Sequence, residues 1–146
     1  MSDGTQPNLD RLAAQHAQVI IRRVIDEEET QKHKDADKKK SKQQLATDVD
    51  NTITKALGVL QEDGVYACFL YLLAREKENG PVVVDEMLNL LDQLGFGWGK
   101  PADHSPEKVL AHITEKVTVN LERLLLVKET LEQMLIYARY GAKARS

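Results

Sequence analysis

Apolar residues recur at intervals of three and four along most of the chain, which is the spacing of one face of an α-helix. The first such stripe follows Asn8, a residue type that caps helix N-termini, and consists of Leu9, Leu12, Ala13, His16, Ala17, Ile20 and Val24. A second stripe consists of Leu45, Val49, Thr52, Ile53, Ala56, Leu57 and Leu60. It predicts a helix that ends at Gly64, because glycine readily adopts the left-handed conformation that closes many helices.

The segment from Val65 to Ala74 is apolar on every side. A helix of this kind is expected to be buried at the centre of a bundle, and a buried strand is the alternative interpretation. Pro81 begins the next predicted helix, which stops at Gly95 and contains Val83, Val84, Met87, Leu88, Leu91 and Leu94. Its opening Val-Val-Val is the place where a strand is a fair alternative.

A glycine-rich loop from Gly95 to His104 follows, and it carries Phe96 and Trp98. The run Ser105-Pro106-Glu107 is typical of a helix start and predicts a short helix that contains Val109, Leu110 and Ile113. The last predicted helix extends from about Val117 to Ala142. Its inner face is expected to hold Val117, Leu121, Leu124, Leu125, Leu131, Leu135 and Ala138.

These patterns predict an all-α fold, a single compact bundle of about six helices with one long C-terminal helix. The length of 146 residues suits one domain with one hydrophobic core. Residues 1–7 are expected to form a flexible N-terminus. Ala36 is the only apolar residue in the range 26–42, so this range is either a solvated helical extension or a mobile charged linker. We favour a partly ordered connector.

Composition sets limits on the protein's surroundings. Cys68 is the only cysteine, so no intramolecular disulfide is expected and the cytoplasm is the natural compartment. The polar N-terminus gives no sign of a secretory signal, and no apolar run reaches the length of about 18 residues typical of a membrane span. The net charge of −3 argues against a protein that binds nucleic acid without partner proteins.

Candidate enzyme and metal sites are weakly supported. His104 and His112 with Cys68 would make three zinc ligands without a fourth. Glu129 and Glu132 form the one clean Glu-x-x-Glu pair on a predicted helix, whereas a magnesium-dependent nucleotide hydrolase needs more carboxylates than one pair. The Gly95-x-Gly97-x-Gly99 run lacks the residues of a phosphate-binding loop, and Trp98 is expected to anchor its loop by burial rather than to stack on a base. We therefore predict no catalytic site, metal or cofactor.

Basic residues gather in a few segments and are candidate contacts to nucleic-acid phosphates. They are Arg22, Arg23, Lys38, Lys39, Lys40, Lys42, Arg123, Lys128, Arg139, Lys143 and Arg145. For any single one of them, a solvated surface position is the simpler interpretation. As a set, they make contact with nucleic acid a hypothesis worth testing.

Two stretches together resemble a known family. The sequence from Ala56 to Ala74, ALGVLQEDGVYACFLYLLA, resembles a hairpin of the small helical subunit of type III-B (Cmr) CRISPR effector complexes, in which a helix ends in a polar-glycine-hydrophobic step and a buried helix follows. The sequence from Leu121 to Ala142 looks like the last helix of that family. With the first helix, the similarity spans most of the chain. The charged range 26–42 and the loop 95–104 depart from the pattern.

The resemblance implies a noncatalytic subunit of an RNA-guided complex in antiviral defence. Such a subunit would stack along the duplex of guide RNA and target RNA, beside the backbone and large subunits and further copies of itself, while base pairing reads the sequence. RNA cleavage would belong to neighbouring subunits. The alternatives are an all-α nucleotide pyrophosphohydrolase-like enzyme and a generic helical adaptor protein.

Overall fold

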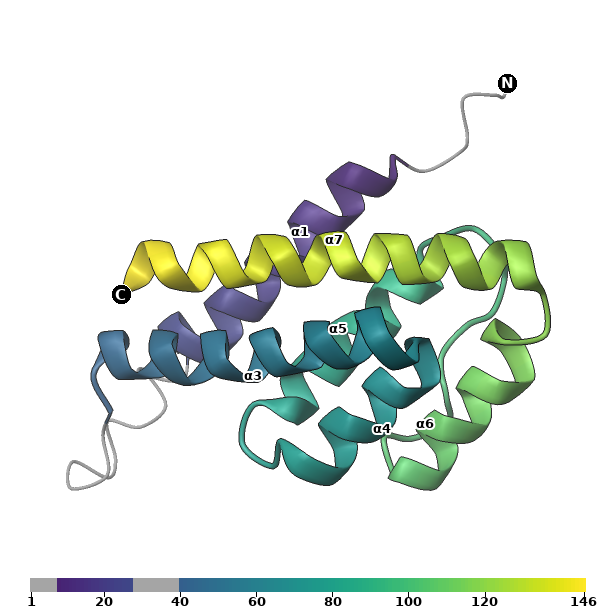
Figure 1. Ribbon diagram of the computed structural model, residues 1–146, viewed down its shortest axis with the longest axis horizontal. Helices are drawn as coiled ribbons and strands as arrows, with labels where there is room; N and C mark the ends of the chain where they lie inside the picture. Colours follow the sequence, from purple (N-terminus) through teal and green to yellow (C-terminus); the bar gives the residue numbers. More distant parts are fainter. Residues whose placement is uncertain (1–7, 28–39) are drawn as a thin grey trace.

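The computed structural model describes residues 8–27 and 40–146, and every regular element within these ranges is helical (Figure 1). The elements are α1 (Leu9–Ile21), the π-helical η1 (Arg22–Glu27), α3 (Lys42–Asp63), α4 (Val65–Arg75), α5 (Gly80–Asp92), α6 (Pro106–His112), the π-helical η4 (Ile113–Val117) and α7 (Leu121–Arg145). The predicted all-α bundle with a long C-terminal helix is therefore confirmed. The predicted flexible N-terminus and residues 28–39 of the predicted connector lie outside the described residues.

Side-chain caps begin four of the helices and explain their positions. Asn8, Ser41, Ser105 and Asn120 each accept a hydrogen bond from the backbone N–H three residues ahead, at 3.0, 3.1, 3.4 and 2.9 Å. This bond satisfies a donor that has no partner within the helix. The last helix was expected to begin near Val117, but the cap at Asn120 places its start at Leu121, and Val117 ends η4 instead.

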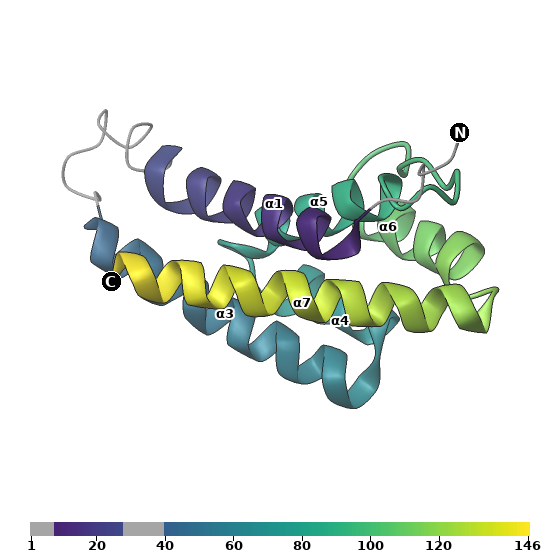
Figure 2. The same cartoon turned by 90° about the horizontal axis from the view of Figure 1, so that it is seen from above.

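The long helix α7 lies between α1 and α3, as the view from above shows (Figure 2). Its buried side chains are Val127, Thr130, Leu131, Met134, Leu135, Ala138 and Ala142. Two residues assigned to its inner face by the sequence, Leu121 and Leu125, are instead 69% and 56% exposed. At 100° per residue, both lie well away from the stripe centred on Leu131 and Ala138, and Leu125 lies almost opposite it.

The apolar segment after Gly64 is helix α4, and the strand alternative is wrong. The prediction that this helix is buried on every side is also wrong, because Tyr66 and Leu70 are 37% and 44% exposed while Cys68 and Phe69 are fully buried. Tyr66 and Leu70 stand four residues apart and share one outward face. The Val-Val-Val run is likewise helical and opens α5, with proline in the first turn.

Glycine backbones shape the loop that follows α5. Gly95, Gly97 and Gly99 have φ angles of 87°, 74° and 66°, a region that side-chain-bearing residues rarely adopt. The loop turns the Trp98 indole inward, where it is 9% exposed and lies 4.8 Å from the Phe96 ring between centroids. The predicted anchoring role of Trp98 is thus confirmed.

We expect opposite effects from alanine at two helical glycines. A Cβ added to Gly80 would lie 2.6 Å from the backbone oxygen of Leu72, whereas one added to the exposed Gly58 of α3 meets nothing within 4 Å. Gly80→Ala should therefore cost about 1–3 kcal/mol of unfolding free energy. Gly58→Ala should add about 0.5–1 kcal/mol, because alanine favours the helix.

Urea unfolding followed by circular dichroism measures both glycine variants. Gly58→Ala serves as the matched control for the substitution itself. A Gly80→Ala protein as stable as the wild type would contradict the tight packing of α4 against the start of α5.

Candidate nucleic-acid interface

Seven of the candidate phosphate-binding residues gather at one end of the bundle. There the end of η1, the start of α3 and the C-terminal end of α7 meet, on the left in Figure 1. We call this set the basic end: Arg22, Arg23, Lys40, Lys42, Arg139, Lys143 and Arg145. Lys38 and Lys39 lie outside the described residues, in the range that joins η1 to α3.

Asp50 of α3 joins the two cations of α7 at the basic end. Its Oδ1 lies 3.6 Å from Arg139 Nε and its Oδ2 lies 3.3 Å from Lys143 Nζ. Thr54, one turn further along α3, donates a hydrogen bond of 3.2 Å to the same Oδ1. The Asp50 side chain is 19% exposed, while those of Arg139 and Lys143 are 40% and 49% exposed. The two cations therefore remain accessible while they share one carboxylate.

Other cations of the basic end also have acidic neighbours. Arg145 donates to Asp26 at 2.8 Å, and Arg22 lies 3.6 Å from Glu27. Lys40 contacts two carboxylates, those of Asp48 and Glu78, each at 2.8 Å. Hydrogen bonds to these two groups raise the pKa of Lys40 above its usual range. Lys42 opens α3 and is exposed.

Arg123 and Lys128 belong to a different part of the surface. Both lie in the first turns of α7, away from the basic end. The Arg123 guanidinium carbon lies 4.6 Å from the centre of the Phe96 ring, a cation–π contact. Lys128 Nζ donates to the backbone oxygen of Gln61 at 3.4 Å. The structure therefore does not place these two residues with the other candidates.

One exposed aromatic residue at this end was missed by the sequence analysis. Tyr140 is 65% exposed and stands three residues before Lys143, on neighbouring positions of the helix surface. An exposed ring beside cations is suited to stacking on a nucleobase. Its helical position, outside the buried stripe of α7, is the signal that could have identified it.

A buried charged cluster connects α1 to α5. His16 Nδ1 lies 2.9 Å from Glu86 Oε1, and both residues are nearly buried, at 6% and 4% exposure. Arg23 donates to Glu86 at 2.8 Å and to Asp85 at 2.6 Å, and Asn89 donates to Glu86 at 3.0 Å. Arg23, a candidate phosphate ligand, is therefore already paired with two carboxylates, one of which is buried.

Electrostatics in this cluster favour the charged forms. Burial raises the pKa of Glu86, but hydrogen bonds from His16, Arg23 and Asn89 outweigh it and hold the pKa below its usual value. Burial likewise lowers the pKa of Arg23, and its hydrogen bonds to Asp85 and Glu86 outweigh that effect and raise it. From the sequence, His16 was placed only in the apolar stripe of the first helix, because its partner lies 70 residues away in the chain.

The weakly supported zinc ligands are not brought together. Within residues 8–27 and 40–146, no group of three or more His, Cys, Asp and Glu side chains is arranged to hold a metal ion. His104 pairs with Asp85 at 3.1 Å, and Cys68 is buried, with its thiol 3.5 Å from the backbone oxygen of Ala56. Burial raises the pKa of the Cys68 thiol to about 12, so the thiolate form is scarce at neutral pH.

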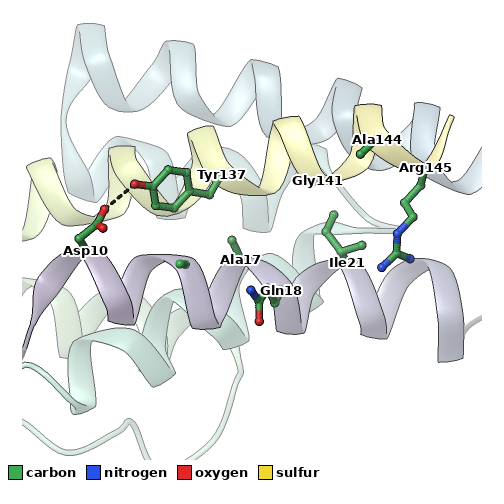
Figure 3. A pocket seen from close by; sticks show the side chains of 9 residues that line it. Asp10, Ala17, Gln18, Ile21, Tyr137, Gly141, Ala144 and Arg145 are labelled. Atoms are coloured by element: carbon green, nitrogen blue, oxygen red, sulfur yellow. Dashed lines mark hydrogen bonds between the residues drawn. The ribbon is translucent and has the colours of Figure 1, made fainter.

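A shallow groove of about 370 Å³ separates α1 from α7 (Figure 3). The small side chains of Ala14, Ala17 and Ala144, with Gly141, line much of it. Tyr137 donates to Asp10 at one end, and this hydrogen bond raises the pKa of the tyrosine. The groove is a consequence of small residues where the two helices cross.

Comparison with protein-family models, with curated proteins and with solved structures finds no match. The class that the fold defines is an all-α bundle built around one long C-terminal helix. Within the part of the chain that the structure describes, no helix has both the length and the apolar character needed to cross a membrane.

We expect the buried Glu86 carboxylate to make stability depend on pH. The pKa of Glu86 is lower in the folded protein than the ordinary value of 4.5, so the carboxylate contributes to the unfolding free energy at pH values above 4.5. The contribution is lost as the pH falls from there through the lowered folded pKa. Glu86→Gln should lower the unfolding free energy at pH 7 by about 3 kcal/mol and flatten its dependence on pH below about 5.

Urea unfolding of wild type and Glu86→Gln at a series of pH values measures both effects. Glu62→Gln, on the exposed surface of α3, controls for the loss of one carboxylate. Equal pH profiles for wild type and Glu86→Gln would contradict the role of this cluster.

Proposed function

We propose that this protein is a noncatalytic subunit of an RNA-guided type III CRISPR effector complex. It lies along the duplex of guide RNA and target RNA and contacts neighbouring protein subunits, including further copies of itself. The observation that carries the proposal is the position of its exposed apolar side chains. They lie on, or next to, the two stretches that resemble the small subunit of the Cmr complexes.

Six large hydrophobic side chains are exposed among the described residues: Tyr66, Leu70, Val119, Leu121, Leu125 and Tyr140. Two of them lie in the stretch 56–74, Leu121 and Leu125 begin the stretch 121–142, and Val119 lies two residues before it, whereas Tyr140 lies at the basic end. Exposed apolar groups that gather on particular helices are typical of surfaces that bind other proteins. Both stretches that resemble the family therefore carry exposed apolar side chains in addition to those that are buried in the core.

The two matched stretches are neighbours in space. Helices α3 and α7 run antiparallel, since Asp50 pairs with Arg139 and Lys143 while Gln61 contacts Lys128. The turn at Gly64 therefore lies beside the first turns of α7, at the opposite end from the basic end (Figure 1). We call the exposed residues Val119, Leu121 and Leu125 the apolar end. This separation supports a subunit with a protein-facing region and an RNA-facing region.

The basic end suits contact with RNA backbone rather than with base edges. Its residues carry point charges and guanidinium groups on helix ends, which neutralise phosphates without reading sequence. In a guide-directed complex, base pairing supplies the sequence specificity. A protein of net charge −3 can take part where a cation of this end exchanges its carboxylate partner for a phosphate.

Purification of the tagged protein from its native host tests the proposal. We expect it to bring down CRISPR RNA and the other effector subunits. Recovery of the protein alone, without RNA and without those subunits, would contradict the proposal. Magnesium-dependent release of phosphate or pyrophosphate from nucleotides by the pure protein would favour the nucleotide-hydrolase alternative instead.

We expect polar substitutions at the apolar end to release the protein partners. The double variant Leu121→Ser/Leu125→Ser removes two exposed leucines, and each change should cost less than about 1 kcal/mol of stability because neither side chain is in the core. Recovery of the other subunits in the same purification should fall at least several-fold.

The control for the leucine variant is Asn51→Ser, on the exposed surface of α3, which should leave recovery unchanged. Thermal melting by circular dichroism checks that all variants are folded. Undiminished recovery with the folded leucine variant would remove the apolar end from the proposed interface.

A further inference from the structure

Arg139 and Lys143 are two partly exposed cations that share one carboxylate. They stand four residues apart on α7, so their side chains point the same way, and both converge on Asp50. Neither distance, 3.6 or 3.3 Å, is that of a short charge-assisted hydrogen bond. Arg139 Nε has no hydrogen-bond partner although it is shielded from solvent.

Three other cations of the basic end are held more closely. Lys40 has two carboxylate oxygens at 2.8 Å, Arg145 has one at 2.8 Å, and Arg23 has two within 2.8 Å. Long and partly exposed ion pairs contribute little to stability and are screened by salt. Arg139 and Lys143 can therefore change partner at a lower cost than these three cations.

A carboxylate held between two cations occupies the position in which a phosphate group would bind. A backbone phosphodiester presents two charged oxygens, as a carboxylate does, and a nucleic-acid backbone also releases condensed counterions when a cation neutralises it. This release favours exchange of Asp50 for a backbone phosphate. The Asp50 side chain, at 19% exposure, lies at the rim of the surface and not in the core.

We propose that Asp50 is an internal competitor of RNA, which occupies the phosphate site formed by Arg139 and Lys143 until an RNA backbone displaces it. This inference rests on the RNA contact of the proposed function and locates it at one pair of residues. Asp50 weakens the binding of RNA by the free protein, and the substitution that removes its charge strengthens that binding. If Asp50 instead oriented the two cations for RNA, the same substitution would weaken RNA binding.

Fluorescence anisotropy with a labelled RNA duplex of about 20 base pairs, the length of a guided heteroduplex, tests the inference. Asp50→Asn should lower Kd about 3- to 10-fold at low salt and should steepen the slope of log K against log salt by about one. The matched control is Asp63→Asn, at the far end of the same helix and exposed. It makes the same charge change and should alter Kd less than about 2-fold.

A double-mutant cycle separates displacement from a general change of charge or of fold. The double variant Arg139→Gln/Lys143→Gln should itself bind RNA more weakly than the wild type. In this background, Asp50→Asn should no longer tighten RNA binding. Equal effects of Asp50→Asn and Asp63→Asn, weaker binding by Asp50→Asn, or tightening that persists in the double background would each overturn the inference. Thermal melting confirms that each variant is folded under the assay conditions.

The outcomes distinguish this inference from the proposed function. If the wild type binds the duplex and Arg139→Gln/Lys143→Gln weakens binding while Asp50→Asn has no effect, the RNA contact stands and only the competitor role falls. If neither the wild type nor Asp50→Asn binds RNA at any salt concentration, both fall.

Discussion

The close approach of α1 to α7 is the constraint on which the other elements depend. Gly141 allows it, because a Cβ at that position would lie 3.1 Å from Ile21 Cγ1, and the buried neighbours Ala138 and Ala142 have small side chains. With α1 seated on one side, α3 packs along the other. The antiparallel direction of α3 then brings Asp50 to Arg139 and Lys143. The small residues of one helix crossing thus determine which charges meet at the basic end.

The regular elements could be predicted from sequence because their signals are local. Asn8 and Ser105 cap helices where the sequence indicated, and periodicity located the buried stripes. Exposure was harder to predict. The continuous apolar run of α4 and the leucines at 121 and 125 were assigned to the core, whereas Leu70, Leu121 and Leu125 are exposed. A periodic pattern shows which positions are apolar, and an exposed apolar surface gives the same pattern as a buried one.

The candidate interface was predictable only as a list of cations. Which of them gather, and which are neutralised, depends on contacts between residues far apart in the chain, such as Arg145 with Asp26, 119 residues away. Arg123 and Lys128 share a helix with Arg139 but lie about four and three turns away from it, so the helical rise separates them. The cluster around Glu86 was missed for the same reason. Each of its carboxylate contacts to α1 and η1 spans more than 60 residues.

In the proposed function, α7 joins an RNA-facing basic end to a protein-facing apolar end. Cross-linking of the assembled complex from the native host, followed by mass spectrometry, tests this division most directly. We expect RNA adducts on peptides around Arg139 and Lys143, and protein cross-links from Lys116 and Lys128, which flank the apolar end. RNA adducts confined to residues 116–128, with protein cross-links only from the basic end, would contradict the account.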